Sequence, residues 1–333
     1  MLKVGKLDSD VLQKIVIDNI DLKRPEVLTR AGIGEDCAVI DYGDYECAIS
    51  TDPITAAVNE IGRLAIHISC NDIASNGIEP LGIALVVMLP VGTTVEDVGI
   101  IMKQAAAAAR ESGVEIIGGH TEVTPAVNQP VIVSTAFGRG KKGQSQSAKN
   151  MKVGDYILMT KTAGLEGTAI IASDNEKQLT QVLTREEIVF AKDLVKKVSV
   201  VKEGIIAGKI GTAGMHDITE GGVLGAVWEM CNIADLGAEL WVEKIPVEVV
   251  TQKICKHFDI DYLRLISSGS MLIVASKEQK DEILSKFAAE SINVACIGQI
   301  ATKERGIVTI NNGVEVTVAP PRMDELYKVA KPI

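Results

Sequence analysis

The residues best able to do chemistry in this 333-residue chain are aspartates that stand among glycine, serine and threonine. They fall in four short segments of the first half, each expected to form a turn at the end of a strand or helix. The segments are Gly-Ile-Gly-Glu-Asp-Cys-Ala at 32–38, Ser-Thr-Asp at 50–52, Asn-Asp-Ile-Ala-Ser-Asn-Gly at 71–77 and Gly-Gly-His-Thr-Glu at 118–122. Glycine lets backbone amides approach an anion, and carboxylates suit a hard cation. The set therefore raises the hypothesis of a metal–nucleotide site.

The candidate metal ligands in these segments are the carboxylates of Asp36, Asp52 and Asp72. Magnesium keeps several waters and binds through few protein carboxylates together with substrate phosphates, so three such residues suffice. Any one of them, taken alone, is explained as well by an aspartate that caps a turn or a helix. Spacing leaves both interpretations open.

A fifth segment, His-Asp-Ile-Thr-Glu-Gly-Gly at 216–222, lies in the second half and runs into an expected helix at 222–233. Either Asp217 or Thr219 can cap that helix. The same helix N-terminus can instead receive a phosphate or a metal-bound anion. Both interpretations again stay open.

Composition argues against several other kinds of partner. With 34 Lys and Arg against 44 Asp and Glu, the net charge of −10 argues against nucleic acid, and aromatic residues are only 3% of the chain. The longest apolar run, residues 83–91, is far shorter than the ~20 residues of a membrane helix. The first residues lack the features of a signal peptide. We expect a cytoplasmic protein with no membrane partner.

Two glycine-rich segments imitate nucleotide-binding motifs. Gly-Arg-Gly-Lys-Lys-Gly at 138–143 fits the dinucleotide pattern but is followed by Gln-Ser-Gln-Ser, which does not start a helix. Gly-Ile-Ile-Ala-Gly-Lys at 204–209 is one residue too short for a P-loop, so we expect a helix end. The six cysteines are widely spaced, which makes structural zinc and disulfides improbable.

The elements that must position the aspartates alternate between strand and helix, which indicates an α/β fold. The clearest helix is 95–112, capped by Thr93 or Thr94 and ended by Gly113; a shorter helix at 60–70 should lead into Asn71. The apolar runs 82–89 and 131–137 lack polar alternation and are typical of strands buried on both faces. Cover from a second copy of the chain is one way to bury them.

The glycine- and serine-rich segment 138–150 is the best candidate for a linker. We therefore predict an N-terminal domain at 1–145 and a C-terminal αβ domain at 146–333. In the second domain we expect strands at 153–160, 270–276, 294–298 and 306–310 and a helical stretch at 184–208.

In this order, the five segments resemble the aminoimidazole ribonucleotide (AIR) synthase superfamily, also called PurM-like. The resemblance covers nearly the whole chain. It implies an N-terminal αβ domain that pairs with a second copy to form a dimeric β-barrel, and a C-terminal αβ domain. It also implies ATP in the groove between the domains, with its phosphates held by Mg²⁺.

The resemblance also implies roles for single residues. The implied metal ligands are Asp36, Asp52, Asp72 and Asp217. The implied nucleotide contacts are Lys6, Gly34, Thr51, Gly118, Gly119, Thr121 and Thr219, with Lys161 as a further cation near the phosphates. The implied catalytic group consists of Asp72, His120 and Glu122.

Within the superfamily, residues 217–226 and 267–272 look most like HypE, the hydrogenase maturation factor that dehydrates a carbamoyl group with ATP. The resemblance implies activation of a substrate oxygen by phosphoryl transfer, on a small molecule or a carried group. Two alternatives stay open: a small-molecule kinase of the thiamine-monophosphate kinase type, and a nucleotide-binding protein without turnover.

The chain departs from the pattern at two places. HypE carries its carbamoyl group on a C-terminal cysteine, whereas the last cysteine here is Cys296. His120 stands where many relatives have Asp or Glu, and a neutral imidazole is a poor ligand for Mg²⁺. Glu122 is the nearest replacement carboxylate.

Overall fold

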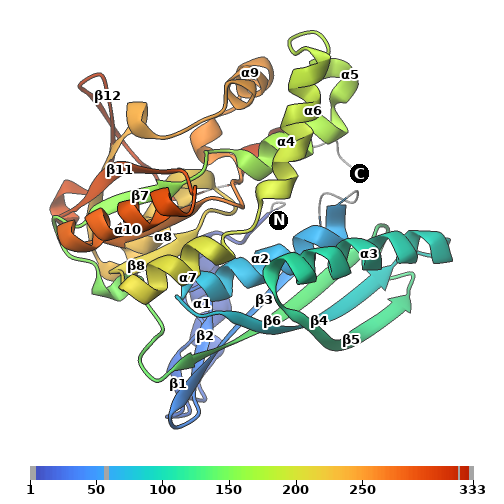
Figure 1. Cartoon of the computed structure of the whole chain (residues 1–333), viewed down its shortest axis with the longest axis horizontal. Helices are drawn as coiled ribbons and strands as arrows, with labels where there is room; N and C mark the ends of the chain where they lie inside the picture. Colours follow the sequence, from blue (N-terminus) through green and yellow to red (C-terminus); the bar gives the residue numbers. More distant parts are fainter. Residues whose placement is uncertain (1–4, 56–59, 322, 330–333) are drawn as a thin grey trace.

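The computed structural model describes residues 5–55, 60–321 and 323–329, and it places two sheets side by side, each with helices packed against it (Figure 1). The first sheet has the order β1-β2-β3-β6-β4-β5, and only β4 and β5 pair in parallel. Its strands are β1 (Val27–Thr29), β2 (Ala38–Asp41), β3 (Tyr45–Ile54), β4 (Pro80–Leu89), β5 (Glu115–Val123) and β6 (Val131–Lys141).

One face of this sheet is covered by α2 (Ile61–Ser75) and α3 (Val95–Ser112), which lie along it in Figure 1. The prediction for α3 is confirmed: Thr94 and Asp97 form a reciprocal capping box, and Gly113 ends the helix at φ 67°. Alanines at 105, 108 and 109 face the core, where small side chains let the helix pack closely.

The second sheet has the order β13-β12-β9-β11-β7-β10-β8. Its strands are β7 (Tyr156–Thr160), β8 (Gly214–Asp217), β9 (Gly237–Trp241), β10 (Met271–Ala275), β11 (Val294–Ala301), β12 (Ile307–Asn311) and β13 (Val314–Thr317). The remaining helices are α1 (Ser9–Ile15), α4 (Leu165–Asp174), α5 (Glu176–Leu179), α6 (Arg185–Asp193), α7 (Val201–Ile210), α8 (Gly222–Ala234), α9 (Val249–Phe258) and α10 (Lys277–Ala289). The proposed boundary at residue 145 falls between β6 and β7.

Three of the expected turns are parts of regular elements instead. Asp72 lies inside α2, Asp52 lies inside β3, and the segment 118–122 continues β5. Asparagine and aspartate compete with the helical backbone, which is why the sequence predicts a helix end at residue 70. Here the Asn71 side chain is bound by a distant segment, so the helix continues to Ser75. The expected helical stretch 184–208 is likewise divided, into α6, a short 3₁₀ turn (Leu194–Lys197) and α7.

The strands β4 and β6 are buried on one face only. In β6, Ile132, Ser134 and Ala136 are fully buried, while the alternate residues are half-buried. In β4, Val86 is 37% exposed. The expectation of two buried faces is therefore wrong for the single chain, because among the described residues no helix covers the second face (Figure 1).

The two halves meet where α2 packs against α7. A Cβ at Gly204 would lie 2.3 Å from the Ala74 carbonyl oxygen, so only glycine permits this approach. The segment 204–209 is thus a packing surface inside a helix and not a phosphate loop, as predicted. Asn71 completes the contact: its Nδ2 donates to the Val198 carbonyl and its Oδ1 accepts from the Val200 amide, both at 2.8 Å.

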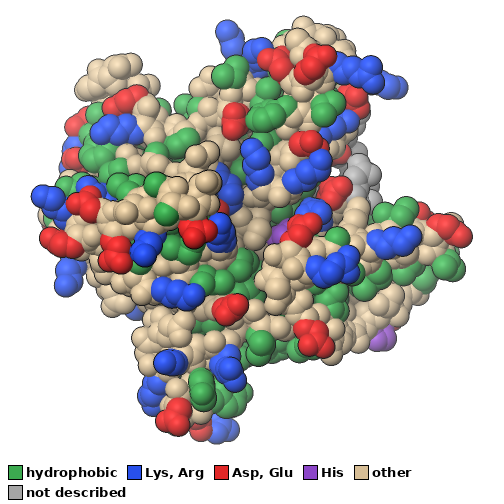
Figure 2. Space-filling view, in the orientation of Figure 1, with side chains coloured by type: hydrophobic (Ala, Val, Ile, Leu, Met, Phe, Trp, Pro, Cys, Tyr) green, Lys and Arg blue, Asp and Glu red, His purple; other side chains and the backbone are tan. Residues whose placement is uncertain are grey.

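Figure 2 shows acidic and basic side chains interspersed over one face of the molecule. The aspartates of interest are not among this surface charge, since Asp72 and Asp217 are buried. In the part of the chain that the structure describes, no helix has the length and apolar character needed to cross a membrane.

Replacing Asn71 by Ala should lower the free energy of unfolding by about 2–4 kcal/mol, because two buried backbone groups lose their partners. Urea denaturation measures this loss. The matched control is Asn76→Ala at the end of the same helix, where one 3.4 Å hydrogen bond is lost and less than about 1 kcal/mol is expected. Equal effects of the two substitutions would contradict the assigned role of Asn71.

Candidate metal and phosphate site

The structure brings the four predicted metal ligands together. Asp72 comes from α2 and Asp52 from β3, and the Ser50 hydroxyl lies 2.5 Å from Asp72 Oδ2 and 3.1 Å from Asp52 Oδ2. Asp36, in the turn before β2, approaches Asp217 at the end of β8. The cluster therefore contains residues from both halves of the chain, because β3 belongs to the first sheet and β8 to the second.

The carboxylates raise one another's pKa. Burial is the main reason that the pKa of Asp72 lies well above its ordinary value, and the charges of Asp217, Asp52 and Asp36 add to it. Burial likewise raises the pKa of Asp36. Burial raises the pKa of Asp217 from 3.8 to about 6, although His216 opposes the shift. Acids held together in this way favour a cation between them.

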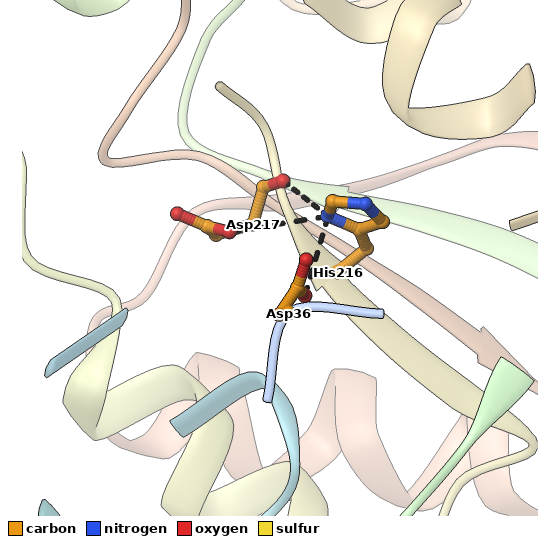
Figure 3. A group of neighbouring side chains, drawn as sticks. All are labelled: Asp36, His216 and Asp217. Carbon is orange, nitrogen blue, oxygen red and sulfur yellow. Dashed lines mark hydrogen bonds and ion pairs between the residues drawn. The ribbon is translucent and has the colours of Figure 1, made fainter. Parts of the chain in front are cut away.

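His216 lies in the cluster although the sequence prediction did not name it as a site residue (Figure 3). Its Nδ1 lies 3.4 Å from Asp36 Oδ2 and 3.9 Å from Asp217 Oδ1. Its Nε2 lies 3.1 Å from Glu229 Oε2. Burial would lower the pKa of His216, but these carboxylates outweigh it and raise the pKa to about 10. In the protein without a metal, a protonated imidazole at this place offsets the charge of the carboxylates around it.

A sequence signal for His216 existed, since it immediately precedes Asp217 in the fifth segment. Glu229 offered none, because it lies within α8 and reaches His216 only through the fold. The His216 side chain in turn lowers the pKa of Glu229 against the effect of burial.

The two predicted lysines have different surroundings. Desolvation would lower the pKa of Lys6, but Glu229, Glu220, Asp36 and Asp217 raise it to about 12, which places Lys6 at the cluster. Lys161 is occupied elsewhere. Its Nζ donates to the Ser199 and Gly269 carbonyls at 2.6 and 2.7 Å and pairs with Glu203 at 2.5 Å. Lys161 therefore ties elements of the second half together, and the expectation that it neutralises phosphate charge receives no support.

Asp217 provides a test of whether this cluster fits a metal ion. Its side chain is 1% exposed, and neither carboxylate oxygen has a hydrogen-bond partner among the described residues. Buried carboxylate oxygens are costly unless something binds them. The donor set consists of hard oxygens, which suits Mg²⁺ better than a softer metal. The residues therefore fit the divalent cation that the sequence suggests.

Two further predicted contacts lie beside the cluster. Gly34, at φ 81°, approaches α8, and a Cβ there would lie 3.0 Å from Glu229 Cβ.

Thr219 precedes α8 but does not cap it, and Asp217 does not cap it either. The residue at the N-cap is Gly221, whose amide donates to Asp324 Oδ2 at 2.7 Å. The capping interpretation is therefore wrong for both residues.

The other predicted contacts lie away from the cluster in the single chain. Thr51 points to the face opposite α2, where its hydroxyl lies 3.1 Å from that of Thr135. The strand register aligns Gly118 with Thr135 on that face and places Gly119 three strands from Asp52, about 14 Å at ordinary strand spacing. These residues therefore share a sheet with the cluster without a direct contact to it that the strand register would provide.

His120, Thr121 and Glu122 lie on the edge strand β5 and are exposed. His120 Nε2 lies 3.4 Å from Glu122 Oε2, and among the described residues neither side chain forms a hydrogen bond or ion pair with the four aspartates. Their catalytic role therefore stays a prediction. Within one chain it lacks a geometric basis.

Comparison with known proteins assigns the chain to a family. Residues 34–140 match the N-terminal domain of AIR synthase related protein, and residues 152–311 match its C-terminal domain. The chain belongs to this family, as its sequence motifs predicted.

Two relatives are similar over most of their length. A hydrogenase expression/formation protein of Methanocaldococcus jannaschii is 26% identical over 91% of this chain and 90% of its own. Carbamoyl dehydratase HypE of Bradyrhizobium diazoefficiens is 27% identical over 83% of this chain and 80% of its own.

Solved structures support the fold. The chain matches a structure of a HypE–HypF complex with a TM-score of 0.77 and 22% identity, over 93% of this chain and 99% of the other. It matches HypE in complex with ATP with a TM-score of 0.69 and 20% identity, over 98% of both chains. The predicted PurM-like two-domain α/β fold is confirmed, while the dimeric barrel stays a prediction.

The site makes the metal-free protein sensitive to pH. Because the pKa of Asp217 rises from 3.8 to about 6 on folding, the folded state binds more protons between these values. With EDTA present, Asp217 should therefore contribute a fall in stability of roughly 2 kcal/mol as the pH rises from 4 to 7, in addition to the falls from Asp36 and Asp72. Asp217→Asn should reduce the fall by that share, as measured by urea denaturation at each pH.

Millimolar Mg²⁺ should reverse the loss in the native protein at pH 7 and leave Asp217→Asn unchanged, because the variant lacks the unpartnered carboxylate. Asp235→Asn, a change on an exposed turn, is the control and should behave as the native protein does. Equal stabilisation of all three proteins by Mg²⁺ would contradict this assignment.

Proposed function

We propose that this protein binds ATP with Mg²⁺ and activates an oxygen atom of a small or carrier-bound acceptor by phosphoryl transfer. The observation that carries the proposal is the convergence of Asp36, Asp52, Asp72 and Asp217 around unpartnered carboxylate oxygens. Mg²⁺ bound there would bridge the carboxylates to the phosphates and neutralise charge that develops during transfer. Lys6 and His216 supply protein cations at the same place.

The names of the relatives suggest the acceptor group, since HypE is a carbamoyl dehydratase. In such a reaction the carbamoyl oxygen attacks the γ-phosphorus, the bond from phosphorus to ADP breaks, and one N–H proton leaves to solvent. The carbon–oxygen bond then breaks with its electron pair going to phosphate. Loss of the second N–H proton leaves a carbon–nitrogen triple bond. We propose this chemistry for the present chain, with hydrogenase maturation as its setting.

The alternatives predict different products. A kinase of the thiamine-monophosphate type would leave the phosphoryl group on its acceptor, whereas a dehydratase releases phosphate. A regulatory nucleotide-binding protein would bind ATP without turnover. Phosphorus NMR of the products separates all three outcomes.

Replacing Asp72 by Ala should weaken Mg²⁺-dependent ATP binding by about 10²-fold or more, because a ligand at the centre of the cluster is lost. Isothermal titration calorimetry measures the affinity. Asp235→Asn serves as the control and should bind normally. If the native protein shows no affinity for ATP with Mg²⁺ present, the proposed function fails.

We also propose that the protein is a homodimer. The first sheet leaves the face opposite α2 and α3 uncovered, and Val86 is exposed on it. At one end of the sheet, a hollow of about 340 Å³ has a lining that includes Tyr45, Leu81 and Phe137. An exposed apolar sheet face of this kind is typical of a protein interface. A second copy would also bring its own Thr51 and β5 to that interface.

Val86→Glu should convert the dimer to a monomer, because the carboxylate would be buried without a partner at the interface. Light scattering after size-exclusion chromatography measures the mass. Val95→Glu is the matched control, since Val95 is 83% exposed in the first turn of α3 on the covered side of the sheet. A native protein that elutes as a monomer at all concentrations would contradict the proposed dimer.

A further inference from the structure

The side chains of the cluster fall into two groups that differ in their ligand atoms. Asp52 and Asp72 are linked by a serine hydroxyl, so this group offers oxygen alone. The second group is Asp36, His216 and Asp217, and one ligand atom from each lies within 4.8 Å of the other two (Figure 3). Among the described residues it is the one set of three acidic, histidine or cysteine side chains that lie this close together. It adds a nitrogen atom to two oxygens.

His216 is held with one ring nitrogen facing the two carboxylates. Its Nε2 lies 3.1 Å from Glu229 Oε2, and this contact fixes the orientation of the ring. Its Nδ1 then lies 3.4 Å from Asp36 Oδ2 and 3.9 Å from Asp217 Oδ1. A histidine that binds a metal almost always donates its other N–H to a carboxylate, a carbonyl or water. The contact with Glu229 therefore prepares Nδ1 to act as a ligand.

Asp217 gives an independent indication of a ligand at this place. Its side chain is 1% exposed, and neither of its carboxylate oxygens has a hydrogen-bond partner within the described parts of the chain. Asp72 also approaches it, but a second acid brings no positive charge. Buried carboxylate oxygens normally have a donor or a cation bound to them. A metal ion between Asp217, Asp36 and His216 meets this need.

In the metal-free protein, a proton on the imidazole ring occupies this position. Nδ1 lies 2.6 Å from the carbonyl oxygen of Asp217, so the imidazolium ring donates to it. The surrounding carboxylates favour positive charge, and a dication offsets more of their charge than one proton does. When a metal binds, the Nδ1 proton leaves to solvent and the nitrogen lone pair binds the metal. The exchange leaves the contact between Nε2 and Glu229 in place.

The donor set decides which class of metal fits. Mg²⁺ prefers oxygen ligands alone, and a neutral imidazole is a poor ligand for it. Imidazole nitrogen binds first-row transition metals well, and carboxylates suit Mn²⁺ among them. Two carboxylates with one imidazole therefore favour a divalent transition-metal ion such as Mn²⁺ over Mg²⁺.

We propose that Asp36, His216 and Asp217 form a subsite for a divalent transition-metal ion, with Mn²⁺ as the ion that fits these donors. Mg²⁺ remains at the oxygen ligands of Asp52 and Asp72, and Asp217 serves both ions through its two oxygens. The inference goes beyond the proposed function, because the subsite needs no nucleotide.

The test uses the full chain, stripped of metal and titrated with Mn²⁺ in the absence of nucleotide. Electron paramagnetic resonance measures the free Mn²⁺, and its pulsed form detects a nitrogen nucleus bonded to the ion. We expect the most tightly bound Mn²⁺ to show nitrogen coupling. Mg²⁺ should displace this ion only at a concentration at least about tenfold higher than that of Mn²⁺.

His216→Gln should remove the nitrogen coupling and weaken Mn²⁺ binding by about 10²-fold, because the nitrogen ligand is lost. Glu229 is a positioning residue that acts through His216. Glu229→Ala should therefore keep the coupling but weaken binding by about tenfold. His257→Gln, in α9 and outside the cluster, is the matched control and should change neither quantity. Circular dichroism checks that each variant folds.

Native protein that binds no Mn²⁺, binds it without nitrogen coupling, or binds Mg²⁺ as tightly would overturn the inference. Coupling that persists in His216→Gln would overturn it too. If that variant does not fold, the anomalous scattering of Mn²⁺ in crystals of the native protein decides the matter. A peak within bonding distance of His216 Nδ1 supports the subsite, and a peak elsewhere contradicts it. Each of these outcomes leaves the proposed ATP binding to its own calorimetric test.

Discussion

The mutual repulsion of carboxylates brought together between the two halves of the chain is the constraint on which the rest of the structure depends. Asp36, Asp52, Asp72 and Asp217 come from four different elements, and burial disfavours the charged forms of Asp36, Asp72 and Asp217. Such a group of charges opposes folding unless cations join it. The protein supplies His216 and Lys6, and the unpartnered oxygens of Asp217 leave room for a metal to supply more.

The contact between the halves resists this repulsion through close packing that involves no charge. Gly204 brings the backbone of α7 against α2, and Asn71 satisfies two backbone groups across the contact. Asn71 immediately precedes Asp72 in α2. Asn71 binds the other half of the chain, and Asp72 belongs to the carboxylate cluster, so both lie in the same turn of the helix. A movement of α2 relative to α7 would therefore also move Asp72 relative to the other carboxylates of the cluster.

The sequence predicted more of the site than of the local structure around it. It predicted the capped helix α3 correctly, because capping residues have strong local preferences, and the four aspartates that it named lie close together in the structure. It failed for the end of α2 and for residues 118–122, where contacts with distant segments decide the backbone. It also failed to separate the two lysines, since Lys161 is bound by carbonyls that are remote in the chain.

By itself, the sequence determined the family and the alternation of strand and helix and named the aspartates that converge, because these depend on residue type and order. The tertiary structure alone decided which charges meet. It placed His216 between Asp36 and Glu229 and kept β5 away from the cluster in the single chain. The reason is physical: electrostatic interaction depends on distance and burial, and neither quantity is contained in the spacing of residues along a chain.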